Sequence, residues 1–219
     1  MRYQFTLTGV SDLIMHQDSV EWADTVQEWR LSPNNPLKKG ENKGDDRRPA
    51  WTWLGYMYHD NTSIALPSSY IVGVLKKAGA RISAGGNKTF KEKSVSGIFV
   101  EDEFIKFFVD GKQIPVKELL ELIHEPSFNE HVKTVREHGF ELFTKRVPIK
   151  ASKNVRVRPR FTNWSASGIL EVTTDAITTE ILSQLFTLAG RIGIGDWRPG
   201  SPISPGPYGM FDTILKLLK

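Results

Sequence analysis

Hydrophobic and polar side chains alternate at the start of the chain. The apolar positions are Tyr3, Phe5 and Leu7, and the polar positions between them are Gln4, Thr6 and Thr8. A period of two residues is typical of a strand with one buried face. Gly9 ends the alternation, so we expect a first strand over 2–9.

Two longer stretches have the spacing of amphipathic helices, with an apolar residue every three to four positions. One lies near 69–82, where Ile71 and Leu75 share a face, and the other lies near 178–192. The residues placed to cap them are Ser68 or Ser69 for the first helix and Asp175 or Thr178 for the second. Shorter helices are expected between 17 and 32 and between 115 and 138.

Further strands are expected near 98–109, 141–150, 154–161, 167–173 and 210–217. The order strand, helix, strands, helix, strand favours an α+β fold of the ferredoxin-like (RRM-like) type, in which two helices cover one face of an antiparallel sheet. We expect a single domain over 1–219 with insertions at about 17–60 and 110–140. The uncovered face of such a sheet is a common platform for nucleic acid.

Two polar segments, 33–49 and 83–97, contain few apolar side chains. Such segments cannot bury enough apolar surface to offset the entropy that is lost on ordering. We therefore predict that both are mobile loops.

Composition narrows the class of protein without naming it. The chain has 219 residues, a net charge of +4 and no cysteine, so disulfides, thiolate zinc sites and a cysteine nucleophile are excluded. No apolar run is long enough to span a membrane, and the early start of the first strand predicts that there is no signal peptide. These features favour a cytoplasmic protein with no membrane partner.

A run of basic residues is the sharpest chemical signal. In the strand expected at 154–161, the period of two puts Arg156, Arg158 and Arg160 on one face, and Lys153 precedes them. Three like charges on one strand face repel one another, so an anionic partner such as a phosphate backbone would stabilise them. Acidic side chains on a neighbouring strand are the alternative partner, and the sequence leaves both open.

A second signal is the segment 189–211, which contains six glycines and four prolines. Neither a helix nor a strand continues through so many of these residues, so we expect a shaped loop. Gly193 and Gly195 would let the backbone approach a polynucleotide, with Trp197 to stack and Arg198 to supply charge. The alternative is a structural loop that joins the last helix to the last strand, with Trp197 in the core.

Motifs for metal binding or catalysis are missing from the sequence. The five histidines have no metal-ligand spacing, no Ser-His-Asp set is readable, and we expect no cofactor. His16 follows the first strand and is the candidate for a general base, although a surface or capping role is the simpler interpretation.

Three segments together resemble the RAMP superfamily, the repeat-associated proteins of CRISPR effector complexes. They are the Leu-Ile-Met-His unit at 13–16, the Leu-Pro-Ser-Ser opening of the first helix with Gly73 and Lys76, and the glycine-rich loop before the last strand. The resemblance is to the backbone subunits, covers both ends of the chain, and is poor at about 100–140. The ending, Gly-Asp-Trp-Arg-Pro followed by Tyr-Gly-x-Phe, is also similar to phage-encoded proteins of unassigned role.

The resemblance implies a non-enzymatic protein that binds RNA or single-stranded DNA, assembles along its ligand and belongs to a multi-subunit ribonucleoprotein of antiviral defence. It implies contacts with the nucleic-acid backbone at the first helix, from Ser68, Ser69 and Lys76, and at the glycine-rich loop. Two alternatives stay open. One is a metal-independent endoribonuclease of the same superfamily, with His16 as general base. The other is a phage interaction protein that acts on a host defence or recombination complex.

Overall fold

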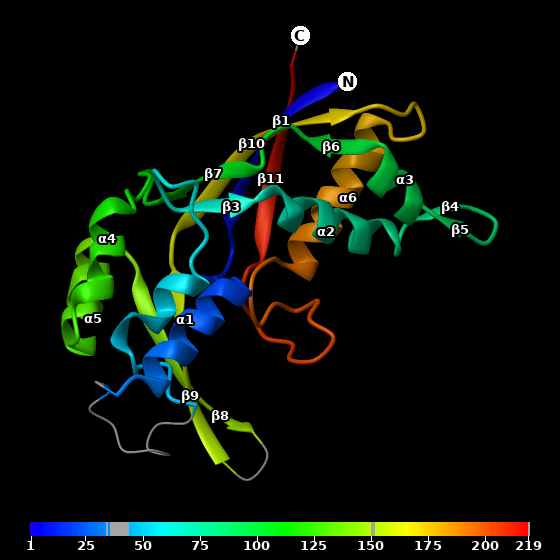
Figure 1. Ribbon diagram of the computed structural model, residues 1–219. Helices are drawn as coiled ribbons and strands as arrows, with labels where there is room; N and C mark the ends of the chain where they lie inside the picture. Colours follow the sequence, from blue (N-terminus) through cyan, green and yellow to red (C-terminus); the bar gives the residue numbers. More distant parts are fainter. Residues whose placement is uncertain (34, 36–43, 150–151, 219) are drawn as a thin grey trace.

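The first strand is an inner strand of a six-stranded sheet in the computed structural model, which describes residues 1–33, 35, 44–149 and 152–218 (Figure 1). β1 (Arg2–Gly9) lies between two neighbours, and every pairing in the sheet is antiparallel. The other strands are β3 (Ala65–Pro67), β6 (Ile98–Val100), β7 (Phe104–Val109), β10 (Trp164–Val172) and β11 (Phe211–Leu218). Their order is β11-β1-β10-β7-β3, and β6 also pairs with β10.

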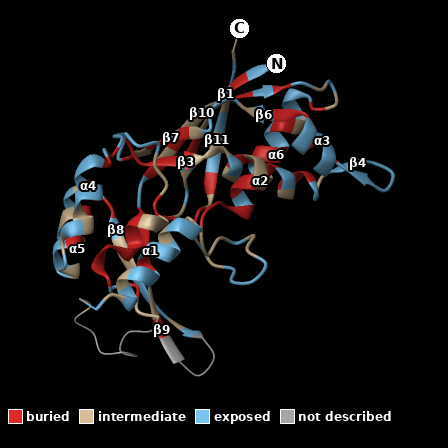
Figure 2. Cartoon of the chain, viewed as in Figure 1, coloured by how far each residue is buried: buried red, intermediate tan, exposed pale blue. Residues whose placement is uncertain are grey.

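Two helices, α2 (Ser68–Gly79) and α6 (Thr179–Ile192), cover one face of this sheet (Figure 1), and buried residues lie along both of them (Figure 2). Phe5 of β1 is fully buried, with its ring 5.8 Å from that of Phe186 on α6. Along the chain, β1, α2, β6 with β7, β10, α6 and β11 give the βαββαβ order of a ferredoxin-like fold. The expected α+β, ferredoxin-like fold class is confirmed.

The two helices differ in how they begin. Thr178 caps α6 as predicted, because its hydroxyl accepts from the backbone N–H of Ile181. α2 begins directly at Ser68 after Pro67 and has no side-chain cap, so the prediction of a serine cap is wrong. The Ser68 N–H donates to the carbonyl of Glu103 at 2.8 Å, which satisfies it without a cap.

The basic hairpin forms a separate sheet, although the sequence predicted a single one. β8 (Glu141–Ile149) pairs with β9 (Ser152–Phe161), and β9 also pairs with the short β2 (Leu13–Ile14). Between β9 and β10, Asn163 has a φ of 48°, a left-handed conformation that asparagine tolerates better than most residues. This residue turns the chain from the second sheet into the first.

Helical segments from two stretches of the chain accompany this second sheet (Figure 1). They are α1 (Val20–Leu31), η1 (Ala50–Tyr56), α4 (Lys117–Glu121), η2 (Leu122–His124) and α5 (Phe128–Glu137). Trp53 of η1 is fully buried among them, edge-on to Phe140 and His131. The domain organisation, one domain with two insertions, stays a prediction.

The segment 83–97, predicted as a mobile loop, has regular structure. It forms β4 (Ser83–Gly85), β5 (Lys88–Thr89) and α3 (Lys91–Ser96). Phe90 and Ser94 are buried, and a Cβ on Gly79 of α2 would lie 2.7 Å from the Ser94 hydroxyl. Because α3 approaches α2 so closely at a glycine, it gains burial that composition alone does not reveal. The prediction of a loop is wrong here, and most of the other predicted loop, 33–49, lies outside the described residues.

His131 on α5 is fully buried and connects two hydrogen bonds. The Trp53 indole donates to its Nδ1 at 2.9 Å, and its Nε2 lies 2.8 Å from the carbonyl oxygen of Glu125. The ring is therefore neutral, with its proton on Nε2. Burial lowers the pKa of His131 below its ordinary value, because the charged ring would lose its hydration.

We expect the protein to lose stability on mild acidification. Because the pKa of His131 is lower in the folded chain than in the unfolded chain, the unfolded state takes up the extra proton first. This contribution is complete above about pH 6.5, the unfolded value, and is lost as the pH falls below it. Burial and the charge of Arg158 also lower the pKa of His16, which adds to the same trend.

Urea denaturation on both sides of this pH, followed by tryptophan fluorescence, measures the change. His131→Gln should reduce the difference in unfolding free energy between the two pH values, and His16 should supply what remains. Equal stability at both pH values, or higher stability at the lower one, would contradict the assignment of a neutral buried ring.

Candidate nucleic-acid interface

The basic strand lies in β9, and its side chains alternate as predicted. Val157 and Phe161 are fully buried, and the three arginines take the other face. Lys153 is paired with Pro148 of β8, and its side chain lies outside the described part of the structure.

All three arginines form ion pairs with acidic side chains. Asp46 is 1% exposed, and its oxygens accept from Arg156 Nη1 at 2.8 Å and from Arg158 Nη1 at 2.9 Å. Arg160 pairs with Glu141, which lies opposite it on β8. The alternative partner named from the sequence, an acid on a neighbouring strand, is found for Arg160, whereas Asp46 lies in a turn outside the strands. Phosphate contact by the arginines stays a prediction.

Arg158 is more enclosed than the other two. Its side chain is 7% exposed, and its guanidinium lies 4.0 Å from the ring centre of Tyr56 and 3.6 Å from Asp196. These contacts join β9 to η1 and to the glycine-rich loop. These contacts give Arg158 a part in holding the fold together, and its contact with a phosphate stays a prediction.

His16 lies beside Arg158, between charged side chains. Its Nδ1 is 3.6 Å from Asp196, and its Nε2 is 3.4 Å from Arg158 Nη2. Burial and the positive charge of Arg158 lower the pKa of His16, whereas burial raises the pKa of the neighbouring Tyr56. Both ring nitrogens therefore face fixed partners, and Tyr56 keeps its proton at neutral pH. These contacts do not test the nuclease alternative.

The glycine-rich loop between α6 and β11 is held by the protein's own backbone. Gly193 and Gly195 are buried and have φ angles of 75° and 79°. A Cβ on Gly195 would lie 2.5 Å from the carbonyl oxygen of Ile14, and the next residue, Asp196, donates its N–H to that same oxygen at 2.8 Å. The close approach that these glycines permit is therefore an internal one, as the structural interpretation of the loop expects.

Trp197 is partly exposed rather than part of the core. Its ring is edge-on to Phe143 at 5.7 Å, and Lys145 Nζ lies 4.7 Å from its ring centre. Both partners belong to β8, so the tryptophan ties the loop to the hairpin. The prediction that it stacks on a base is not tested by these contacts.

A small pocket brings α2 and the glycine-rich loop together. Its volume is about 140 Å³. The residues that line it are Ser69, Tyr70, Gly73, Val74 and Lys77 of α2 and Gly193, Ile194, Gly195 and Arg198 of the loop. We call it the α2 pocket. Two regions that the sequence singled out separately therefore meet at one place.

The lysine at this pocket is Lys77, whereas the sequence pointed to Lys76. Lys76 is exposed and does not line the pocket, and neither does Ser68. Residues 69, 73 and 77 are four apart, so they share one face of the helix. That spacing was present in the sequence and would have identified both Gly73 and Lys77.

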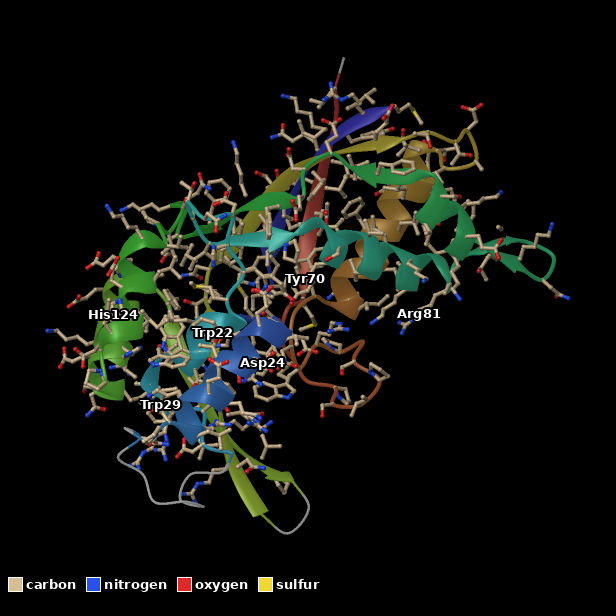
Figure 3. All side chains as sticks on the ribbon, viewed as in Figure 1. Trp22, Asp24, Trp29, Tyr70, Arg81 and His124 are labelled. Atoms are coloured by element: carbon tan, nitrogen blue, oxygen red, sulfur yellow. The ribbon has the colours of Figure 1, made fainter. Side chains whose placement is uncertain are left out.

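Three cations gather at this place without an acidic partner in the described ranges: Lys77, Arg81 and Arg198. Burial, and then the charges of Arg198 and Arg81, lower the pKa of Lys77. Arg198 donates to the carbonyl of Gly195 at 2.5 Å, which keeps its guanidinium at the pocket. Arg81 follows the end of α2 (Figure 3). An anion in the pocket would relieve the repulsion among them.

In the part of the chain that the structure describes, no three histidine, aspartate or glutamate side chains are grouped to hold a metal ion. Within the same ranges, every helix is too short or too polar to cross a bilayer.

Comparison with known proteins gives weak likenesses. No protein-family model and no curated protein matches the sequence. Among solved structures, Cmr6 from Pyrococcus furiosus aligns with a TM-score of 0.36 and 14% identity, over 96% of this chain and 97% of its own. A chain of a Type III-B Cmr-beta complex bound to cognate target RNA aligns with a TM-score of 0.31 and 12% identity, over 99% of this chain and 64% of its own. Both scores are too low to support a functional argument, so RAMP membership stays a prediction from the sequence.

Proposed function

We propose that the chain binds single-stranded nucleic acid, with RNA as its main ligand, and that the α2 pocket holds one backbone phosphate. The observation that carries the proposal is the meeting of Lys77 and Arg198 in that pocket, with no acidic partner in the described chain. By contrast, the arginines of β9 are already paired with carboxylates.

The size of the pocket fits a single charged group. Pockets that hold whole small molecules have volumes of about 300–1,000 Å³. The α2 pocket, at about 140 Å³, is smaller than that and is open to solvent beside Gly73. A phosphate group can enter it while the sugar and base remain outside.

The donors that line the pocket suit phosphate oxygens. An arginine presents its donors in a planar fork that matches two oxygens, and a lysine adds a mobile ammonium. The exposed hydroxyl of Ser69 supplies a further donor on the same face of α2. Contacts of this kind carry no sequence information, so the proposed binding is independent of base sequence.

The proposal includes a place in a multi-subunit ribonucleoprotein, which rests on the sequence resemblance alone. The interaction-protein alternative makes a different forecast, because it needs no bound nucleic acid. Nuclease-sensitive nucleic acid that co-purifies with the protein supports our proposal.

Gly73→Leu tests the proposal, since it fills the pocket without removing a charge. A Cβ at this position meets nothing within 4 Å, and leucine favours a helix more than glycine by about 0.5–1 kcal/mol. We expect a folded protein of equal or higher stability whose affinity for single-stranded RNA falls at least tenfold. Fluorescence anisotropy with labelled RNA and DNA oligonucleotides measures the affinity.

The matched control is Gly73→Ala, which adds one methyl group and gains similar helix propensity. Its affinity should fall less than that of the leucine variant. If Gly73→Leu is stable and binds as tightly as the wild-type protein, the α2 pocket is not the binding site.

A further inference from the structure

A large cavity lies between α1, the start of η1 and the turn from η2 to α5. Its volume is about 620 Å³, and it shares no lining residue with the α2 pocket. Trp29 and Trp51 line it together with His124 and Phe128. Figure 3 shows Trp29 on α1 and His124 on the helical segments that face it. We call it the aromatic cavity.

Trp29 and Trp51 both line this cavity, and neither indole N–H donates to another described residue. Trp51 is 8% exposed, and a tryptophan as buried as this usually has a partner for its N–H. Neighbouring tryptophans follow that rule, since Trp22 donates to the carbonyl of Thr52 at 3.0 Å and Trp53 donates to His131. Neither indole nitrogen is among the fully buried atoms that lack a partner in the described chain, so water hydrates both in the free protein, and a ligand with acceptor atoms can replace that water.

The charge that this cavity offers to a ligand is positive. Arg48 is exposed and makes no direct ion pair in the described ranges, although its charge contributes to lowering the pKa of Asp45. The adjacent Arg47 is already paired with Asp45 at 2.7 Å. The carboxylate of Glu125, which also lines the cavity, accepts from the N–H of Ser127 at 2.7 Å. An anionic group of a ligand could therefore form an ion pair with Arg48.

Two parts of the lining of the aromatic cavity are held by contacts within the protein. Trp51 is held edge-on by Trp22, with ring centres 5.3 Å apart. The turn before α5 is held by the hydrogen bonds that run from Trp53 through His131 to the carbonyl of Glu125. Because these side chains are already ordered, they lose little conformational entropy when a small ligand binds.

We propose that the aromatic cavity binds one nucleotide unit, with its base against the aromatic rings and its phosphate at Arg48. A nucleobase is planar, stacks on aromatic side chains and presents acceptor atoms to indole N–H groups. The volume lies within the range of about 300–1,000 Å³ that small-molecule sites occupy. The unit is either a free mononucleotide or one nucleotide of a strand. The inference does not depend on the α2 pocket.

Titration with AMP, GMP, CMP and UMP tests the proposal, followed by calorimetry and by quenching of tryptophan fluorescence. We expect saturable binding of at least one mononucleotide, with a Kd on the order of 10–100 µM. Arg48→Gln should weaken it by about tenfold or more, since a hydrogen bond to a charged group is lost. Arg30→Gln is the matched control, because this exposed arginine of α1 does not line the cavity and should leave the affinity unchanged.

The Gly73→Leu variant separates this site from the α2 pocket. Mononucleotide binding that survives in that variant and falls in Arg48→Gln supports a site for a free nucleotide. If mononucleotides do not bind, residual oligonucleotide binding in Gly73→Leu that depends on Arg48 and Trp29 supports a site for a nucleotide of a strand. The proposal is overturned if the cavity binds neither mononucleotides nor oligonucleotides. It is also overturned if binding is unaffected by Arg48→Gln and Trp29→Leu in folded protein.

Discussion

Asp46→Asn should lower the free energy of unfolding by about 3–5 kcal/mol, because it removes the partner of a buried arginine. Asp46 is 1% exposed and pairs with both Arg156 and Arg158. The side chain of Arg158 is 7% exposed, so its charge cannot recover hydration without moving β9 away from η1. An uncompensated buried charge is among the few single changes that cost so much.

Guanidinium denaturation of the wild-type and variant proteins, followed by circular dichroism, measures this loss. Asp24→Asn is the matched control, since Asp24 is an exposed acid of α1 with no ion pair in the described chain. Arg156→Gln should cost less than Arg158→Gln, because the side chain of Arg156 is 28% exposed. A loss of less than about 1 kcal/mol for Asp46→Asn would place it among exposed ion pairs and contradict the structural role of this cluster.

Short-range periodicity predicted the ferredoxin-like core. The alternation around Phe5 and the helical spacing around Leu75 and Leu185 depend on neighbours in sequence, and each apolar set is buried as expected. Membership of β8 and β9 in a second sheet was not predictable in this way. It depends on the turn at Asn163 and on pairing with β2, which is more than a hundred residues away along the chain.

The chemistry of the basic strand was likewise decided by a distant residue. The strand pattern gave both possible partners of the arginines, phosphates or acids, and could not choose between them. Asp46 lies in a polar segment without apolar neighbours, and such a segment gives no sign that one of its carboxylates is buried. The α2 pocket differs, because the four-residue spacing from Ser69 to Lys77 was readable, while the approach of Arg198 to it was not.

Replacing Lys77 and Arg198 together by glutamine should weaken binding of single-stranded RNA by about 100-fold or more at low salt, since two charged hydrogen bonds at about 1.5 kcal/mol or more each amount to about 3 kcal/mol. Both cations line the α2 pocket, and neither has an acidic partner in the described part of the chain. Removing them therefore leaves no carboxylate uncompensated. Arg198 also donates to Gly195, so circular dichroism must show that the loop and the fold survive.

Lys76→Gln is the matched control for the loss of a positive charge from α2. It removes the same charge one position away, from an exposed residue that does not line the pocket. A site defined by its geometry should distinguish the two lysines, whereas a diffuse attraction between a basic helix and a polyanion would not.

The most direct test of the phosphate site is the salt dependence of RNA binding, measured in the wild-type, Lys76→Gln and Lys77→Gln/Arg198→Gln proteins. If the pocket neutralises one phosphate, the slope of log K against log salt should fall by about 0.7 in the double variant, the value for one phosphate of a single strand. The Lys76→Gln slope should stay close to that of the wild-type protein. An unchanged slope in a folded double variant, or an equal change in Lys76→Gln, would contradict a phosphate site between α2 and the glycine-rich loop.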